Sequence, residues 1–125
     1  MADELITVMK VHDILLVAMP ADPDDATISA LQEKVLQVMD KVNAKALVLD
    51  ISAVETLDSF FARTVVETVR MVGLMGGETV IAGMRPSVAI TATQLGFTLH
   101  NVKTALDVDR AMDKLNKIPS RKGGR

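Results

Sequence analysis

The sequence predicts an α/β fold: a mostly parallel sheet with an N-terminal antiparallel hairpin and the element order ββαβαβαβα. Strand-like and helix-like runs alternate after the N-terminal hairpin, which indicates parallel strands joined by helical crossovers. Two of the strand-like runs, KALVLDI and ETVIAGM, are apolar without alternation, as is typical of strands buried on both faces. The first two apolar runs are only two residues apart, which suits a hairpin and is too short for a crossover.

The hairpin and the first helix have recognisable boundaries. LITVMKV and ILLVAMP flank His12-Asp13, so we expect a tight turn there. The cluster PADPDD then interrupts regular structure and supplies N-capping side chains. From about Asp25, apolar residues recur at spacings of three and four, which predicts a helix that ends at Asn43. These apolar residues are Ile28, Leu31, Val35, Val38 and Val42.

The central part of the chain reads as strand, turn, helix and strand. KALVLDI predicts a buried strand, and the stretch LDSFF follows it as a turn. A helix then runs to about Met75, where Gly76-Gly77 ends it. ETVIAGM predicts the next buried strand.

The last part of the chain predicts two helices and a short strand. Pro86 is well placed at the first position of a helix, which Gly96 ends. We expect one face of this helix to hold its apolar residues, namely Val88, Ala89, Ala92 and Leu95. A short strand near Leu99–Val102 and a last helix from about Ala105 to Leu115 complete the fold.

Length and charge indicate a single domain with no polyanionic partner. The 125 residues are 49% apolar, which is ample for one core. We expect a domain over residues 1–116 and, because NKIPSRKGGR is basic and contains glycine and proline, a flexible basic tail over residues 117–125. A net charge of −2 gives no reason to expect nucleic-acid or acidic-membrane binding.

The composition also suggests where the protein works. The chain has no cysteine, which excludes disulfides, thiol catalysis and cysteine-bound metal and suits a reducing cytosol. MADELITVMK has acids where a signal peptide needs bases. The longest stretch without a charged residue, 86–102, is too polar to span a membrane. We therefore expect a soluble cytoplasmic protein.

Motifs that carry catalysis are missing from the sequence. There is no phosphate-binding glycine loop and no GxSxG elbow around a serine. His12 and His100 have no cysteine or carboxylate cluster at metal-ligand spacing, so we expect a turn or strand-edge role for both. The sequence therefore predicts a protein that is not an enzyme and needs no cofactor or metal.

The helix after LDSFF has two faces on a helical wheel. The face expected to pack on the sheet holds small and β-branched residues, namely Ala62, Val65, Val66, Val69, Val72 and Gly73. Phe61 falls at the edge of that face and should be buried, whereas Phe60 falls on the far side. The far side and its flanks also hold Arg63, Glu67, Arg70, Met71 and Leu74. Such an outward stripe is either ordinary surface or a docking surface, and its position beside Ser59 favours docking.

Ser59 itself has a structural and a functional interpretation. Ser59 and Asp58 are both good N-caps, although Ala62 replaces the glutamate of a capping box. A phosphate at a helix N-terminus is favoured by the helix dipole, so the fold should tolerate it. It would add about two negative charges beside Asp58 and Phe60, which would repel a partner that docks there.

Three segments, LVLDISAVETLDSFFAR, ETVIAGMRPSVAITATQLG and KTALDVDRAM, make the chain resemble a STAS domain, the fold of bacterial anti-sigma-factor antagonists. The resemblance covers Leu5 to Leu115 and is strongest to the short RsbS-type antagonists of the stressosome. In many sporulation-type antagonists a glycine follows the serine of the DS turn. Phe60 stands there in this chain, which favours the stressosome branch.

The resemblance implies a scaffold subunit that assembles with STAS-domain co-antagonists, makes homo-oligomer contacts and captures a serine/threonine switch kinase. The kinase would phosphorylate Ser59 and leave, and a phosphatase would reset the site. A second acceptor in related co-antagonists matches approximately Thr91, whose hydroxyl could equally bond to the backbone. The candidate partner contacts are Asp58, which orients or marks the site, Phe60, Arg63, Glu67 and Met71.

Two alternatives remain open. The protein could be a free anti-anti-sigma factor that binds a single anti-sigma kinase. Less favoured is a receiver-like phosphoprotein that uses Asp50, which ends a central strand. Receivers also need an acidic pair after the first strand to hold magnesium, and here KVHD turns directly back.

Overall fold

A single sheet of five strands organises the molecule, and the computed structural model describes it over residues 7–96 and 102–116. The strands follow each other across the sheet in chain order: β1 (Thr7–Val11), β2 (Ile14–Ala18), β3 (Ala46–Asp50), β4 (Glu78–Ala82) and β5 (Lys103–Ala105). β1 and β2 are antiparallel, and every other neighbouring pair is parallel. The predicted fold class and element order are confirmed.

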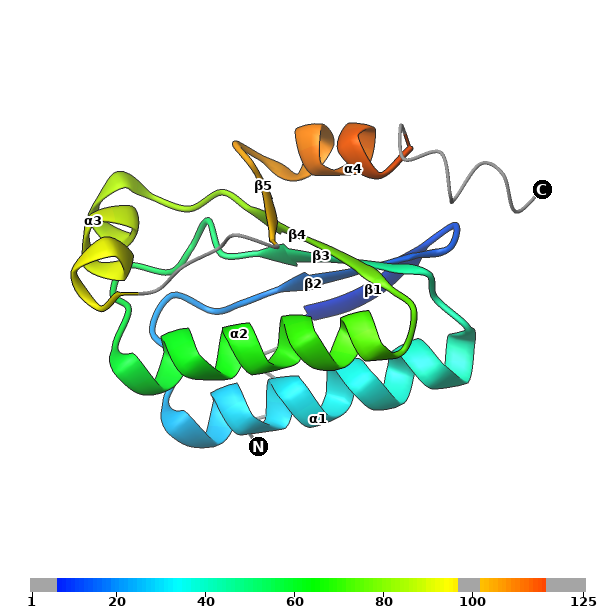
Figure 1. Cartoon of the computed structure of the whole chain (residues 1–125), viewed down its shortest axis with the longest axis horizontal. Helices are drawn as coiled ribbons and strands as arrows, with labels where there is room; N and C mark the ends of the chain where they lie inside the picture. Colours follow the sequence, from blue (N-terminus) through cyan, green and yellow to red (C-terminus); the bar gives the residue numbers. More distant parts are fainter. Residues whose placement is uncertain (1–6, 97–101, 117–125) are drawn as a thin grey trace.

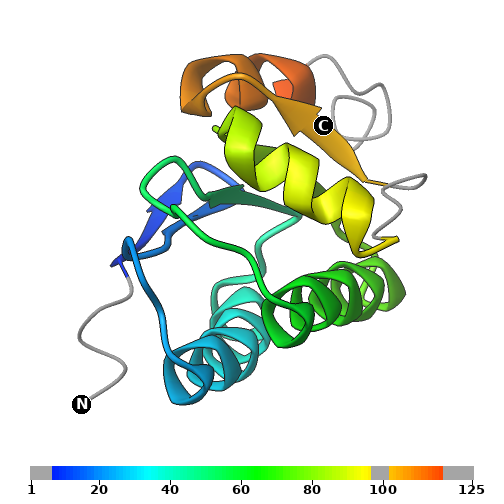
Figure 2. The same cartoon turned by 90° about the vertical axis from the view of Figure 1, so that its left-hand side faces the viewer.

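Four helices cover this sheet unequally. They are α1 (Asp25–Val42), α2 (Ser59–Leu74), α3 (Pro86–Gln94) and α4 (Val108–Asn116). Figures 1 and 2 show α1 and α2 side by side under one face, with α1 toward β1, and α4 on the opposite face. The starts of α1 and α2 lie at the same end of the molecule as α3 (Figure 1).

The element ends follow the predicted local chemistry. His12 begins the two-residue hairpin turn with a left-handed φ of 57°, and Asn43 ends α1 with a φ of 55°. Pro86 is in the first turn of α3, and Gly96 follows that helix with a φ of 71°. Because Asn tolerates the left-handed region and proline lacks only an N–H that a first turn leaves unused, these residues place the boundaries where the sequence predicts them.

Each face of the sheet carries its own core. The larger core lies between the sheet and α1 and α2, and it includes Leu15, Leu49 and Phe61. The smaller core lies under α4, where Ala111 and Leu115 pack on Val48 and Val80. KALVLDI and ETVIAGM supply residues to both cores, which explains why these two strands do not alternate in polarity.

Two face assignments from the helical wheel are wrong. Gly73 is exposed, with no atom near the place where a Cβ would lie, and Leu95 is 42% exposed. The buried face of α2 is turned toward Thr64 and Thr68, because α1 lies beside it. Gln32 of α1 donates from Nε2 to Thr68 Oγ1 at 3.2 Å, which joins the two helices.

The last strand and helix begin later than the sequence predicts. β5 is Lys103–Ala105, so Ala105 belongs to the strand and the helix begins only at Val108. Asp107 precedes α4, and its Oδ1 accepts a hydrogen bond from the Arg110 N–H at 2.8 Å. Most of the predicted strand near Leu99–Val102, His100 and the predicted tail over residues 117–125 lie outside the described residues.

Candidate functional site

The loop between β3 and α2 is held in place by the strand ends around it. The Ile51 N–H donates to the carbonyl of Ala82 at 2.9 Å, and the Ser52 N–H donates to Asp50 Oδ1 at 2.9 Å. Arg85 then donates from Nε to the carbonyl of Ser52 at 2.8 Å. These bonds tie the loop to the end of β4, so the start of α2 has a defined position at the carboxyl end of the sheet.

Gly83 lets the two loops approach each other this closely. Its φ is +78°, and a Cβ added there would lie 2.7 Å from the Cβ of Ser52. Both facts require glycine at this position. Gly83 and Arg85 stand in the GMRP segment, but the sequence analysis did not single them out as positioning residues, because their contacts join loops far apart in the chain.

Asp58, and not Ser59, caps α2. Asp58 Oδ1 accepts a hydrogen bond from the backbone N–H of Phe61 at 2.8 Å, with the extended backbone that an N-cap adopts. Ser59 is the first residue of the helix. The interpretation of Ser59 as the cap is therefore wrong, and the capping role falls to its neighbour.

Ser59 therefore does not cap the helix, and its side chain makes no structural hydrogen bond among the described residues. The residue is exposed, and among the described residues its hydroxyl makes no side-chain hydrogen bond. It lies in the first turn, where the backbone N–H groups and the helix dipole favour negative charge. A phosphate on its Oγ would meet solvent on one side and the positive end of the helix on the other.

The two phenylalanines after Ser59 differ less than the sequence predicts. Phe61 is 2% exposed and belongs to the main core, as expected. Phe60 is only partly exposed and packs against the same core. The expectation that Phe60 faces fully outward is therefore wrong, because part of its side chain packs against the main core.

Four of the predicted residues form one exposed stripe along α2. Ser59, Arg63, Glu67 and Met71 are spaced four residues apart, and all four are exposed. At 1.5 Å per residue, Arg63 lies about 6 Å along the axis from Ser59, Glu67 about 12 Å and Met71 about 18 Å. Charge at Ser59 is screened over about 8 Å at physiological ionic strength, so of the charged residues in the stripe it acts mainly on Arg63 and little on Glu67.

An apolar patch occupies the far end of the same helix. Leu74 is 89% exposed, Met75 47% and Met71 37%. Met71 thus belongs by position to this distal patch rather than to the Ser59 turn. The predicted contact residues fall into two groups, and only Asp58, Phe60 and Arg63 lie close to Ser59.

Thr91 is engaged by the backbone of its own helix. Its Oγ1 donates to the carbonyl of Ser87 at 3.0 Å, and the residue is partly buried. This is the backbone-bonded hydroxyl that the sequence analysis set beside the phosphoacceptor interpretation. Modification of Thr91 would first have to break that bond, and no such step is needed at Ser59.

Asp50 lacks the surroundings of a receiver phosphoacceptor. Its Oδ1 accepts from the Ser52 N–H, and β1 leads through His12-Asp13 straight into β2. Within residues 7–96 and 102–116, no three His, Cys, Asp or Glu side chains are grouped so that they could hold a metal ion. The same described residues include no helix long and apolar enough to cross a membrane.

Comparisons with known proteins agree with this fold. A family model described as STAS domain matches residues 6–111. A serine-to-glutamate variant of RsbS from Moorella thermoacetica is 36% identical with a TM-score of 0.80, over 89% of this chain and 94% of that one. A second solved structure is described as "Molecular architecture of the stressosome, a signal integration and transduction hub". Its chain is 35% identical with a TM-score of 0.75, over 88% of this chain and 96% of that one.

Curated relatives are longer than this chain. The RsbT co-antagonist protein RsbRD of Bacillus subtilis (strain 168) is 35% identical over 80 residues, which is 64% of this chain and 29% of that protein. Across four RsbT co-antagonist proteins of that organism, the chain spans between 29% and 40% of their length. The family match extends over most of the chain, so the chain belongs to the STAS-domain family.

Proposed function

From its membership in the STAS-domain family, we propose that this protein is a phosphorylatable scaffold subunit of a stressosome-type assembly. In this proposal it is a binding protein of the cytoplasm and not an enzyme. It holds a serine/threonine switch kinase of the RsbT type together with STAS-domain co-antagonists and makes contacts with further copies of itself. Phosphorylation of Ser59 releases the kinase, and a phosphatase resets the site.

The observation that carries the proposal is that Asp58 alone caps α2, which leaves the hydroxyl of the neighbouring Ser59 unbonded among the described residues. Asp58 caps α2, and Ser59 is exposed at the first helical position with no structural bond among the described residues. A phosphate can therefore be added and removed without disturbing the cap. It would bring about two negative charges beside Asp58 and make this surface strongly acidic.

Arg63 gives the phosphate a partner on the same helix. It lies four residues after Ser59 on the exposed stripe, and pairs at this spacing are neighbours on a helix surface. Among the described residues Arg63 makes no ion pair, so in the unmodified protein it is available to the kinase. After phosphorylation it would pair with the phosphate, so the kinase would lose a cation and meet a dianion. This exchange makes release a local event at the Asp58–Arg63 turn.

Thr91 is the second acceptor in the proposal, and we expect it to be phosphorylated after Ser59. Its hydroxyl is bonded to the carbonyl of Ser87, so its phosphorylation needs a prior rotation of the side chain. We expect slower labelling of Thr91 than of Ser59 by the same kinase. The order of the two modifications would then be set by the accessibility of the two hydroxyls.

The direct test is to incubate the protein with an RsbT-type kinase and ATP and to map the modified residue by mass spectrometry. We expect phosphoserine at Ser59 and its loss in Ser59→Ala. Ser87→Ala is the matched control, because Ser87 is also exposed in the first turn of a helix. Unchanged labelling of Ser59→Ala, or labelling confined to Ser87, would refute the proposal.

Capture of the kinase is the second measurement. In a pull-down with the RsbT-type kinase, wild type should retain the kinase, and both the phosphorylated protein and Ser59→Asp should release it. Light scattering of the protein mixed with a co-antagonist separates the assembly from a free antagonist. A high-mass particle supports the scaffold, and a one-to-one complex with the kinase alone supports the free anti-anti-sigma alternative.

A further inference from the structure

β1 forms one edge of the sheet, and that edge is open among the described residues. β1 is the first strand in the sheet order, and among the described residues only β2 pairs with it. Val11 and Ile14 close the two-residue turn, so the alternation of an antiparallel ladder directs Thr7, Met9 and Val11 to β2. The backbone N–H and C=O groups of Val8 and Lys10 therefore face outward, as on any open edge.

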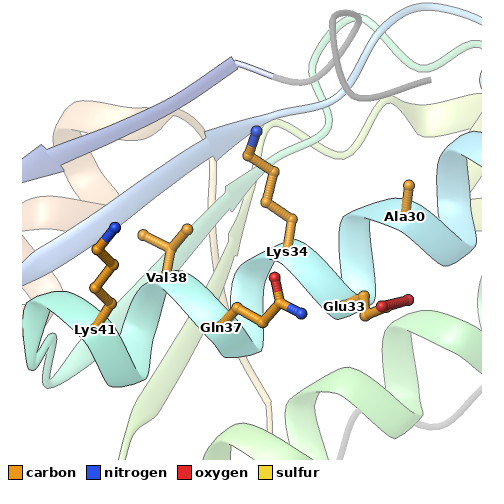
Figure 3. A pocket seen from close by; sticks show the side chains of 6 residues that line it. All are labelled: Ala30, Glu33, Lys34, Gln37, Val38 and Lys41. Carbon is orange, nitrogen blue, oxygen red and sulfur yellow. The ribbon is translucent and has the colours of Figure 1, made fainter. Parts of the chain in front are cut away.

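A groove runs along α1 on the same side of the molecule. It has a volume of about 330 Å³ and is lined by Ala30, Glu33, Lys34, Gln37, Val38 and Lys41. Figure 3 shows Lys34, Val38 and Lys41 rising from one side of α1, whereas Glu33 and Gln37 leave from the other. Every residue that lines the groove belongs to α1, and Val38 of the groove and Val8 of β1 both pack against the main core.

Two lysines and one acid, Glu33, line this groove, and its lysines make no ion pair among the described residues. The ion pairs among the described residues are Lys103–Glu78 and Arg110–Asp107, and neither involves a lysine of this region. Lys10 is the register partner of Leu15, which belongs to the core under α1, so its side chain points to the α1 face. Lys10 on the edge strand and Lys34 and Lys41 on α1 therefore lie on the same face of the sheet.

The opposite face of the same edge is apolar. Met9 is 52% exposed and is the register partner of the partly buried Leu16. α4 covers this face over β3, β4 and β5, so among the described residues it leaves the face of β1 open (Figure 2). A strand added beside β1 would thus meet cations with every second side chain and apolar surface with the others.

We propose that the β1 edge is a docking site for an extended acidic segment of a partner protein, which adds to the sheet as a sixth strand. Backbone groups of the segment would bond to Val8 and Lys10. Its acidic side chains would enter the groove bordered by Lys34 and Lys41, and its apolar side chains would lie beside Met9. Such strand addition combines main-chain hydrogen bonds for affinity with side-chain alternation for specificity.

Charge decides against a second copy of this chain as the occupant. An antiparallel pair of β1 strands centred on Met9 would place Lys10 of one copy opposite Val8 of the other. The lysines of both copies would then gather on one face of the joined sheets, with no acid of the groove other than Glu33 to offset them. Like charges brought together across an interface are unfavourable, whereas an acidic segment meets the three lysines with opposite charge.

The test uses a short acetylated peptide in which valine and glutamate alternate, titrated into the full-length protein and followed by NMR. We expect the backbone amide signals of Val8 and Lys10 to shift and the affinity to fall as salt is raised. The lysine version of the peptide is the matched probe and should not bind. Lys34→Glu combined with Lys41→Glu should weaken binding by about tenfold or more, and Arg70→Glu on α2 should leave it unchanged.

Lys10→Pro tests the backbone part of the proposal. It removes an N–H that faces away from β2, so the hairpin should survive, as proline does on edge strands. We expect Lys10→Pro to abolish binding and Lys10→Gln to weaken it only partly. Equal binding of both peptides, binding that persists in Lys10→Pro, no binding, or concentration-dependent dimerisation through β1 would each overturn the proposal. If Lys10→Pro does not fold, the charge-reversal pair decides.

Discussion

The first turns of α1 and α2 are built alike and differ in one functional respect. Asp24 and Asp58 both accept a hydrogen bond from the N–H three residues later, in each case at 2.8 Å. The first helical residue is Asp25 in α1 and Ser59 in α2. α1 thus carries permanently the adjacent pair of negative charges that α2 would acquire only by phosphorylation. The comparison shows that this fold accommodates an acid at the first helical position.

The third helical residue distinguishes the two turns in packing. It is Thr27 in α1 and Phe61 in α2, and both are buried. The larger side chain of Phe61 buries more apolar surface under α2. The first turn of α2, which holds Ser59, is therefore packed more firmly than the first turn of α1. In the proposed switch at Ser59, this packing would keep the turn in place while added charge changes what the turn binds.

The largest expected effect is on the packing of Phe61 under the first turn of α2. Phe61→Ala should lower the free energy of unfolding by about 3–5 kcal/mol, because it removes a ring that is buried in the core. Phe60→Ala is the matched control and should cost clearly less, since Phe60 is only partly buried. Urea unfolding measures both. Equal costs for the two variants would contradict the difference between the two rings.

The next effect concerns the cap of α2. Asp58→Ala should cost about 1 kcal/mol, because the N–H of Phe61 loses its acceptor. Ser59→Ala should change stability far less, since its hydroxyl has no structural bond among the described residues. Thermal unfolding of the two variants shows which of the two side chains stabilises the start of the helix. A larger loss in Ser59→Ala would mean that the assignment of the cap is incorrect.

Ser59→Asp makes the start of α2 resemble the start of α1. We expect its Tm to stay within a few degrees of wild type, because the helix dipole favours the added carboxylate. Calorimetry of the isolated protein measures this, with Ser59→Ala as the neutral reference. A variant that unfolds would show that Ser59 has a structural role that Asp25 does not share.

The smallest effect is a dependence on acid pH at the start of α1. The hydrogen bond from the Thr27 N–H lowers the pKa of Asp24 below its usual 3.8. A lowered folded-state pKa means that the contribution to stability is complete above the unfolded pKa and is lost as pH falls through the folded value. Stability measured from pH 5 downward should therefore fall less steeply in Asp24→Asn. Asp25→Asn is the control, and an identical slope in wild type and Asp24→Asn would contradict the assignment.

Local chemistry in the sequence predicted most of the elements. Pro86 and Gly96 bound α3 as expected, Asn43 ends α1, and His12-Asp13 forms the hairpin turn. Each of these signals acts through the backbone of one or two neighbouring residues, so no knowledge of the rest of the molecule is needed. The family resemblance rests on the same kind of information and is confirmed.

The errors concern positions whose surroundings come from elsewhere in the chain. Phe60 was expected to face outward, and Gly73 and Leu95 inward, because a helical wheel gives directions but not neighbours. Two acceptable caps stood side by side at the start of α2, and the choice of Asp58 over Ser59 depends on how the preceding loop enters the helix. That entry is set by contacts of this loop with the ends of β3 and β4.

The sequence by itself determined the order of the elements, the buried strands, the boundaries of most helices and the candidate serine. Those features follow from side-chain periodicity and from backbone preferences, which are properties of short segments. Only the tertiary structure decided which hydroxyl is free, which phenylalanine is half-buried and how far Met71 lies from Ser59. It alone placed the open edge of β1 and the lysines of α1 on one face of the sheet. Burial and proximity are relations between distant segments, and packing of the whole chain creates them.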